Sequence, residues 1–173
     1  NGMDVVYLAI PEDGSASSYS ASVILATAAH EMTHAVTYTL KTWKSLLAGN
    51  ERACQEELFL DEGWSHLSES LCGYGVSGGN VKFLEVFLEN TPEYSFCGPS
   101  ASGQDDSAGR RGAMAMFLSW LFWQKGGMTW DTKNPVVPVD AGGIGFLKSM
   151  VSSPETGWES IGLAYGTSTR ALF

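Results

Sequence analysis

The feature that most constrains this chain is a His-Glu-x-x-His sequence at residues 30–34, inside a stretch that favours a helix. Ser18 or Ser20 can cap the start of this helix, and the alanine- and leucine-rich run that follows propagates it. No glycine or proline interrupts the sequence between Ser15 and Gly49. Because residues four apart lie on one face of a helix, the two imidazoles should point the same way.

This motif predicts a metal site. His30 and His34 on one helical face can supply half of a tetrahedral zinc site. Glu31 between them can reach a metal-bound water and take its proton. The chain has only three histidines, so two of them at this spacing favour a metal site over a surface or core role. A catalytic zinc site also needs a third protein ligand and one open position for water.

A second predicted helix, from about residue 62 to 72, carries the candidates for that third ligand. No histidine follows His34 at the spacing of metzincins, and no cysteine lies close behind the motif. Glu62, His66 and Glu69 are spaced by four and three residues, so they share one face of this helix. An ordinary solvated charged face is the alternative, but the remaining histidine of the chain lies in this row.

The Glu62-Gly63 pair that follows the first motif resembles the glutamate motif of the gluzincin metallopeptidases, whose third zinc ligand is that glutamate. The longer stretch from Leu60 to Glu69 is similar to the hyicolysin family within that clan. Only these two metal motifs are highly specific. Weaker similarity continues over most of the chain, at residues 73–75, 78–80, 94–95, 111–121 and 145–157.

The predicted elements indicate an α+β, mainly α fold, and the resemblance implies that it is a single zincin-like catalytic domain over residues 1–173. We expect this domain to be part of a longer chain. In such a domain a small N-terminal β element accompanies an active-site helix packed on a glutamate helix. The resemblance also implies that His30, His34 and Glu62 bind one zinc ion and that Glu31 is the general base. The expected protein is a zinc-dependent endopeptidase with peptide or protein substrates, secreted or otherwise extracytoplasmic.

One position departs from the family's pattern. Gluzincins generally place a tyrosine or histidine where it can stabilise the oxyanion, and here Arg111 occupies the corresponding position. A guanidinium can donate hydrogen bonds to an oxyanion. The alternative, which we favour at this point, is that Arg110 and Arg111 begin a solvated helical turn. Other candidates for the donor are Tyr74, Tyr94 and His66.

The remaining polar residues near the second motif have competing interpretations. We favour His66 as a partner that orients a zinc ligand, ahead of no role and ahead of ligation in place of the glutamate. Glu69 is either such a partner or a charge on the helix surface, and both interpretations stay open. Glu56 and Glu57 are interpreted as solvated charges. Asp61 is interpreted as the N-cap of the second helix.

Composition excludes several other classes of function. A net charge of −9 argues against nucleic acid or an anionic membrane as a partner. The longest apolar run, Ala113 to Trp123, is too short to span a membrane, which takes about twenty residues. Cys54, Cys72 and Cys97 allow either one disulfide with a free thiol or three free thiols. The oligomeric state stays open.

The rest of the chain is predicted to alternate helices with irregular segments. Residues Asp4 to Ile10 are rich in β-forming side chains and precede Pro11, which predicts a strand. This strand could pair with a substrate backbone or be an ordinary sheet strand. Further helices are predicted at about residues 80–89, 110–125, 142–152 and 157–165, with irregular segments at 97–109 and 128–143.

A function from another class is also compatible with the motifs. The chain could be a zinc-containing scaffold or adhesion module, derived from a peptidase, that no longer cuts peptides. The unsettled oxyanion donor is the only support for that alternative. The presence of Glu31 argues against it, because a binding module has no need for a carboxylate at that position.

Overall fold

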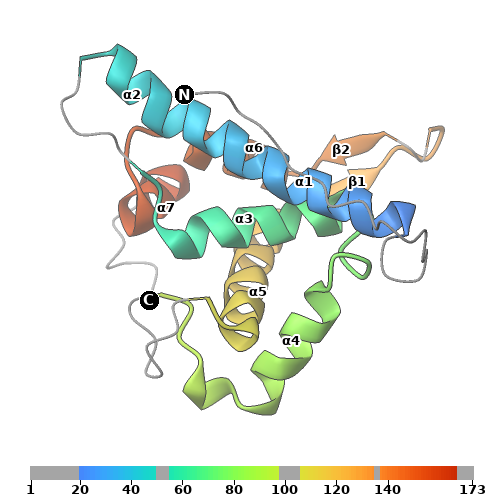
Figure 1. Cartoon of the computed structure of the whole chain (residues 1–173). Helices are drawn as coiled ribbons and strands as arrows, with labels where there is room; N and C mark the ends of the chain where they lie inside the picture. Colours follow the sequence, from blue (N-terminus) through green and yellow to red (C-terminus); the bar gives the residue numbers. More distant parts are fainter. Residues whose placement is uncertain (1–19, 50–54, 98–105, 135–136, 167–173) are drawn as a thin grey trace, which may run out of the picture. The chain divides into compact units, whose positions relative to one another are not determined.

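The computed structural model describes residues 20–49, 55–97, 106–134 and 137–166. These residues are mainly helical and include one two-stranded sheet, in agreement with the expected mainly α class (Figure 1). The chain divides into two compact units. The first unit comprises Asn1–Val36 and Leu58–Phe117, and the second comprises Thr37–Glu57 and Leu118–Phe173.

The predicted motif helix is confirmed, as a helical run of three consecutive segments. Helix α1 spans Ala21–Thr37, a π-helix, η1, spans Tyr38–Trp43, and helix α2 spans Lys44–Leu47. At its start, Ser20 Oγ accepts a hydrogen bond of 3.3 Å from the backbone N–H three residues ahead. At its end, Gly49 has a φ of 79°, a left-handed conformation that stops a helix.

In the first unit, the predicted glutamate helix is α3, which spans Leu58–Leu71 and so begins four residues earlier than expected. The prediction that Asp61 caps this helix is therefore wrong, because Asp61 lies inside the first turn. The earlier start follows from apolar anchoring, since Phe59 and Leu60 are buried in the core. The core of this unit also contains Ala26, Trp64, Leu67, Ala113, Met114 and Ala115.

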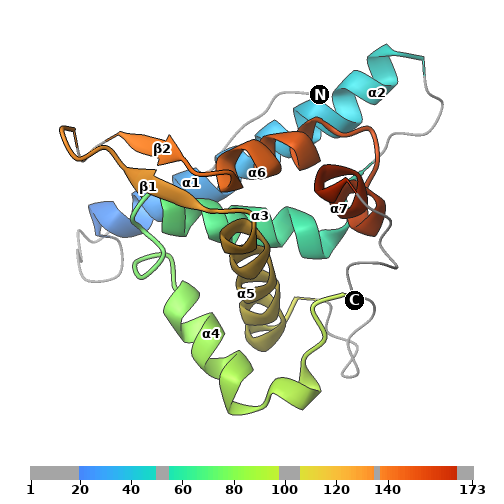
Figure 2. The same cartoon turned by 180° about the vertical axis from the view of Figure 1, so that it is seen from behind.

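Helices α1 and α3 lie side by side in both views (Figures 1 and 2). Small hydroxyl side chains bridge them: Thr33 Oγ1 lies 2.8 Å from Ser68 Oγ, which in turn lies 3.1 Å from the carbonyl oxygen of Ala29. Such short side chains allow the two backbones to approach closely. This approach brings the faces that carry the two motifs together.

The loop after α3 is anchored to it by Asn80. This residue is 4 % exposed, and its Nδ2 donates a hydrogen bond of 2.7 Å to the carbonyl of His66. Helix α4 then runs from Asn80 to Glu89, as predicted, and helix α5 from Ala108 to Gln124. A Cβ on Gly112 would lie 2.1 Å from the carbonyl oxygen of Phe83, so only glycine permits this closeness of α4 and α5.

The second unit contains the described sheet, a hairpin of β1 (Met128–Trp130) and β2 (Pro138–Asp140). The strands are antiparallel, with Thr129 paired to Val139. The prediction of an irregular segment at 128–143 is therefore wrong in part, while the strand predicted near the N-terminus lies outside the described residues. The hairpin leads into helix α6, and both are visible in Figure 2.

Helix α6 spans Gly143–Ser152 and packs on helix α7, which spans Gly157–Tyr165, in agreement with the two predicted C-terminal helices. A buried ion pair joins η1 to the segment before α3. Lys41 Nζ lies 2.6 Å from Glu56 Oε2, with 0 % and 1 % of the two side chains exposed. The interpretation of Glu56 as a solvated charge is therefore wrong, whereas Glu57 is exposed.

Two further sequence-based expectations concern cysteines and membranes. Cys72 and Cys97 carry free thiols, so they do not pair with each other, and Cys54 lies outside the described residues. Across the part of the chain that the structure describes, no helix has both the length and the apolar character that crossing a membrane requires.

Candidate metal centre

Both motif histidines of α1 face the glutamate of α3. His30 Nε2 lies 3.5 Å from Glu62 Oε2, and His34 Nε2 lies 3.7 Å from Glu62 Oε1. Bonds of about 2.0–2.1 Å at tetrahedral angles hold two ligand atoms roughly 3.4 Å apart. The two separations are close to that value and too long for N–H···O hydrogen bonds. The three side chains thus have the spacing of metal ligands.

An unsatisfied oxygen also marks this position. Glu62 Oε2 is buried and has no hydrogen-bond partner among the described residues. A buried carboxylate oxygen without a partner is costly, and a cation removes that cost. Two imidazoles and one carboxylate are a donor set that zinc accepts. The residues present therefore fit a zinc ion.

Each of the two motif histidines is held from behind by a carboxylate. His30 Nδ1 lies 2.7 Å from Glu69 Oε1, and His34 Nδ1 lies 2.9 Å from Asp61 Oδ2. A carboxylate only accepts, so each Nδ1 carries a proton, and in the neutral ring each Nε2 presents its lone pair. Of the two interpretations of Glu69, a charge on the helix surface is wrong, because Glu69 is 2 % exposed and contacts His30.

Sequence reasoning missed the role of Asp61. The residue stands one position before the predicted ligand Glu62, so helical spacing places it on a different face and gives no signal for a shared site. Its contact with His34 depends on how α1 and α3 cross. Only the tertiary arrangement of the two helices reveals it.

His66 joins the same network. Its Nδ1 lies 3.1 Å from Glu69 Oε1, so one carboxylate oxygen serves both His66 and His30. These three residues have potential ligand atoms within 4.8 Å of one another, as do His30, His34 and Glu62. The first set is held together at hydrogen-bond lengths, whereas the second has the wider spacing of ligands around an ion.

Burial and charge shift the pKa values of His30 and Glu62. Burial lowers the pKa of His30, but the carboxylates of Glu62 and Glu69 outweigh it and raise the pKa to about 9. Burial raises the pKa of Glu62, but His30, Arg111 and His34 outweigh it and lower the pKa to about 2. The site thus concentrates negative charge on carboxylates that attract a cation. A divalent ion that binds His30 must displace the proton from this imidazole.

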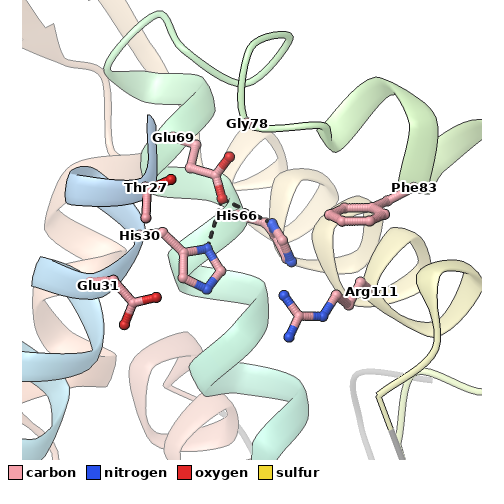
Figure 3. A pocket seen from close by; sticks show the side chains of 8 residues that line it. All are labelled: Thr27, His30, Glu31, His66, Glu69, Gly78, Phe83 and Arg111. Atoms are coloured by element: carbon pink, nitrogen blue, oxygen red, sulfur yellow. Dashed lines mark hydrogen bonds and ion pairs between the residues drawn. The ribbon is translucent and has the colours of Figure 1, made fainter. Parts of the chain in front are cut away.

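A pocket of about 180 Å³ opens beside the ligand cluster (Figure 3). Glu31 lines it next to His30. The pocket draws residues from α1, α3, α4 and α5 and from the loop before α4. Its lining consists of Thr27, His30, Glu31, His66, Glu69, Gly78, Phe83 and Arg111.

Arg111 reaches into this pocket from α5. Its Nε and Nη2 bind the two oxygens of Asp106, and its Nη1 lies 3.6 Å from Glu62 Oε2. The interpretation of Arg110 and Arg111 as a solvated turn is wrong, because Arg110 is 4 % exposed and Arg111 lines the pocket.

The two tyrosines considered as oxyanion donors are placed elsewhere. Among the described residues that line the pocket, neither Tyr74 nor Tyr94 occurs. The ring of Tyr94 packs so tightly on Gly109 that a Cβ there would lie 2.4 Å from it. Arg111 and His66 are thus the oxyanion candidates that lie in the pocket.

Gly78 supports the cluster from the loop before α4. A Cβ at this position would lie 1.6 Å from Glu69 Oε2, so any side chain would push the carboxylate away. The sequence offered no signal for this role beyond the glycine itself. The absence of a side chain at Gly78 thus allows the loop backbone to pack against the Glu69 carboxylate, which contacts His30 and His66.

Comparison of the chain with protein-family models, with curated proteins and with solved structures finds no match.

Proposed function

We propose that this chain is a zinc-dependent peptidase of the gluzincin kind. The observation that carries the proposal is the convergence of His30 Nε2, His34 Nε2 and the Glu62 carboxylate at ligand spacing, from two helices and two separate motifs. Glu31 borders the adjoining pocket, as a general base would. The sequence resemblance to hyicolysin-like peptidases supports the same function.

In this proposal the two glutamates have opposite duties. Glu62 binds the ion with His30 and His34, while Glu31 stays off the ion and faces the substrate. Asp61 and Glu69 accept the Nδ1 protons of the two histidines, which fixes each ring with its Nε2 toward the ion.

Zinc bound by these ligands would lower the pKa of a coordinated water to about 7 and polarise the substrate carbonyl. Glu31 takes the proton from the attacking water and later gives it to the leaving amine. Arg111 has two of its nitrogens engaged by Asp106, which fixes the guanidinium and leaves Nη1 facing the site. From there Nη1 can donate a hydrogen bond to the oxyanion that forms on the substrate.

Metal analysis combined with one conservative substitution tests this proposal. Elemental analysis of the purified protein should give about one zinc ion per chain, and Glu62→Ala should lose it. Glu31→Gln should keep the zinc and lose casein hydrolysis, because an amide cannot accept the proton. Glu85→Gln, an exposed position on α4, is the matched control and should keep both.

The outcomes separate the proposal from its alternative. Zinc bound by the parent and by Glu31→Gln, with no hydrolysis of casein by the parent, would favour a zinc-containing scaffold. Hydrolysis by Glu31→Gln at the rate of the parent would remove this residue as the base. Zinc retained by Glu62→Ala would make His66 the next candidate for the third ligand.

A further inference from the structure

Asp106 lies outside the proposed ligand set, yet it holds a side chain that approaches one of the ligands. Its two carboxylate oxygens accept hydrogen bonds from Nε and Nη2 of Arg111. The third nitrogen of the guanidinium, Nη1, lies 3.6 Å from Glu62 Oε2. Asp106 is therefore linked to the third proposed ligand through a single side chain, which lines the pocket beside the ligand cluster (Figure 3).

The guanidinium of Arg111 is close to Glu62 without being hydrogen-bonded to it. Bonds between a cationic N–H and a carboxylate are about 2.7–2.9 Å long, so the separation of 3.6 Å is too long for one. Glu62 Oε2 is buried and has no hydrogen-bond partner among the described residues. A movement of Nη1 by less than about 1 Å would bring it to bonding distance of this oxygen.

Burial would make a bond between these two groups strong. Only 26 % of the Arg111 side chain and 12 % of the Glu62 side chain are exposed, so water screens their attraction weakly. A buried carboxylate oxygen without a partner is costly, and a guanidinium can remove that cost as a metal ion can. The guanidinium and the ion are therefore competing partners for the same carboxylate.

The attachment to Asp106 restrains the guanidinium. A carboxylate that binds two nitrogens of an arginine fixes both the plane and the position of the group. The Asp106 side chain is 50 % exposed, so its replacement does not disturb the core. The start of α5 also does not depend on it, because Ser107 Oγ accepts the backbone N–H of Arg110 there, at 3.3 Å.

We propose that Asp106 is a positioning residue that holds Arg111 away from Glu62 and so keeps this carboxylate free to bind the ion. The inference rests on the proposed function and names a residue that controls the metal affinity of its site. Without the Asp106 carboxylate, Arg111 would bond to Glu62, and an incoming ion would have to displace it. A half-exposed side chain that contacts none of the three ligands should thus affect metal binding.

A double-mutant cycle tests this inference without turnover. Zinc dissociation constants are measured by competition with a zinc-binding dye for the parent, Asp106→Asn, Arg111→Met and the double variant. Asp106→Asn should bind zinc about 10- to 100-fold more weakly, the range typical of residues that support a ligand from behind. Arg111→Met should bind zinc at least as tightly as the parent, because the competing cation is gone.

The double variant separates the release of Arg111 from a simple loss of charge. If Asp106 acts through Arg111, Asp106→Asn/Arg111→Met should bind zinc within about 2-fold of Arg111→Met. Loss of a negative charge alone would instead weaken zinc binding by the same factor in both backgrounds. Glu85→Gln, an exposed change on α4, is the control and should bind zinc as the parent does. Circular dichroism checks the fold of each variant, and Asp106→Ser replaces Asp106→Asn in the cycle if the latter does not fold.

Three results would overturn the inference. Equal zinc affinity in Asp106→Asn and the parent would show that Arg111 stays away from Glu62 unaided. An equal loss in both backgrounds would leave only the charge of Asp106 as the cause. Weaker zinc binding by Arg111→Met than by the parent would make Arg111 a support of Glu62 and not its competitor. Failure of the proposed function has a different signature, namely no zinc bound by the parent, and it would remove this inference as well.

Discussion

Glu69 Oε1 lies 2.7 Å from His30 Nδ1, and the Glu69 side chain is buried. The same oxygen serves a second imidazole, so one side chain fixes two rings of the proposed active site. Burial raises the pKa of Glu69, but the two histidines outweigh it and lower the pKa, which keeps the carboxylate ionised near neutral pH. The strength of metal binding should therefore depend on this residue, although it lies outside the proposed ligand set.

Glu69→Gln is expected to weaken zinc binding by about 10- to 100-fold, since an amide can present its N–H to His30 and disturb the tautomer. The measurement is a competition titration with a zinc-binding dye. Glu85→Gln serves as the control, because it makes the same chemical change on an exposed face of the same unit. Equal zinc affinity in the two variants would contradict the role of Glu69.

Asp61→Asn is expected to weaken zinc binding less than Glu69→Gln. The Asp61 carboxylate lies 2.9 Å from His34 Nδ1, but 29 % of this side chain is exposed, so water can replace part of the contact. The same dye titration ranks the two variants. A larger loss at Asp61 than at Glu69 would mean that the orientation of His34 limits metal binding.

Gly78→Ala should reproduce the loss of zinc without changing any titratable group. Its new Cβ would overlap Glu69 Oε2 and force the carboxylate away from His30. An affinity within about 10-fold of the Glu69→Gln value is expected, because both changes act on the same contact. Ser77→Ala, one residue earlier in the same loop, is the control and should bind zinc as the parent does.

The extent to which the sequence predicted the site depends on periodicity. His30 and His34 share one face of a first helix, and Glu62, His66 and Glu69 share one face of a second. Spacings of three and four residues are enough to form these two groups. The relation between the two groups came from a family resemblance, and the structure brings them to ligand distance. Spacing could not determine that the faces meet, because that depends on the packing of the two helices.

The wrong predictions concern residues whose environment depends on contacts with residues distant in the sequence. Glu56 precedes a helix and is typical of a solvated charge, yet it forms a buried ion pair with Lys41 of η1. Asp61 is a residue type that often caps helices. The helix nevertheless begins three residues before it, at Leu58, because Phe59 and Leu60 are buried in the core. Local preference is weak against such burial, which explains why the element types were predicted better than their ends.

The buried pair of Lys41 and Glu56 gives a stability prediction for the second unit. Lys41→Met should lower the free energy of unfolding by about 3–5 kcal/mol, because it leaves a carboxylate buried without its partner charge. The double variant Lys41→Met/Glu56→Gln should lose less, since the amide oxygen can still accept from the backbone N–H of Gly157, 2.7 Å away. Urea unfolding of both variants measures the difference. A double variant less stable than the single one would contradict the uncompensated charge as the cause.

The carboxylate of Asp140 should make the stability of the second unit depend on pH. Its oxygens accept backbone N–H groups of Gly142, Ile144 and Gly145 at 2.7, 3.0 and 2.8 Å, where α6 begins. These bonds lower the pKa of Asp140 from its ordinary value of 3.8. A carboxyl group with a lowered folded pKa stabilises the fold above the unfolded value and loses that effect as the pH falls through the folded value.

The melting temperature of Asp140→Asn should therefore lie below that of the parent at pH 7. The gap should begin to close as the pH falls below 3.8 and should be gone below the lowered pKa of the folded state, where the parent carboxyl is also neutral. Asp131→Asn is the comparison, since its carboxylate accepts one backbone N–H, that of Lys133, and sits away from the start of α6. The Asp140 gap should exceed the Asp131 gap at neutral pH, because three bonds to the helix start are affected instead of one. A gap at Asp140 that stayed constant with pH would show that its charge does not stabilise α6.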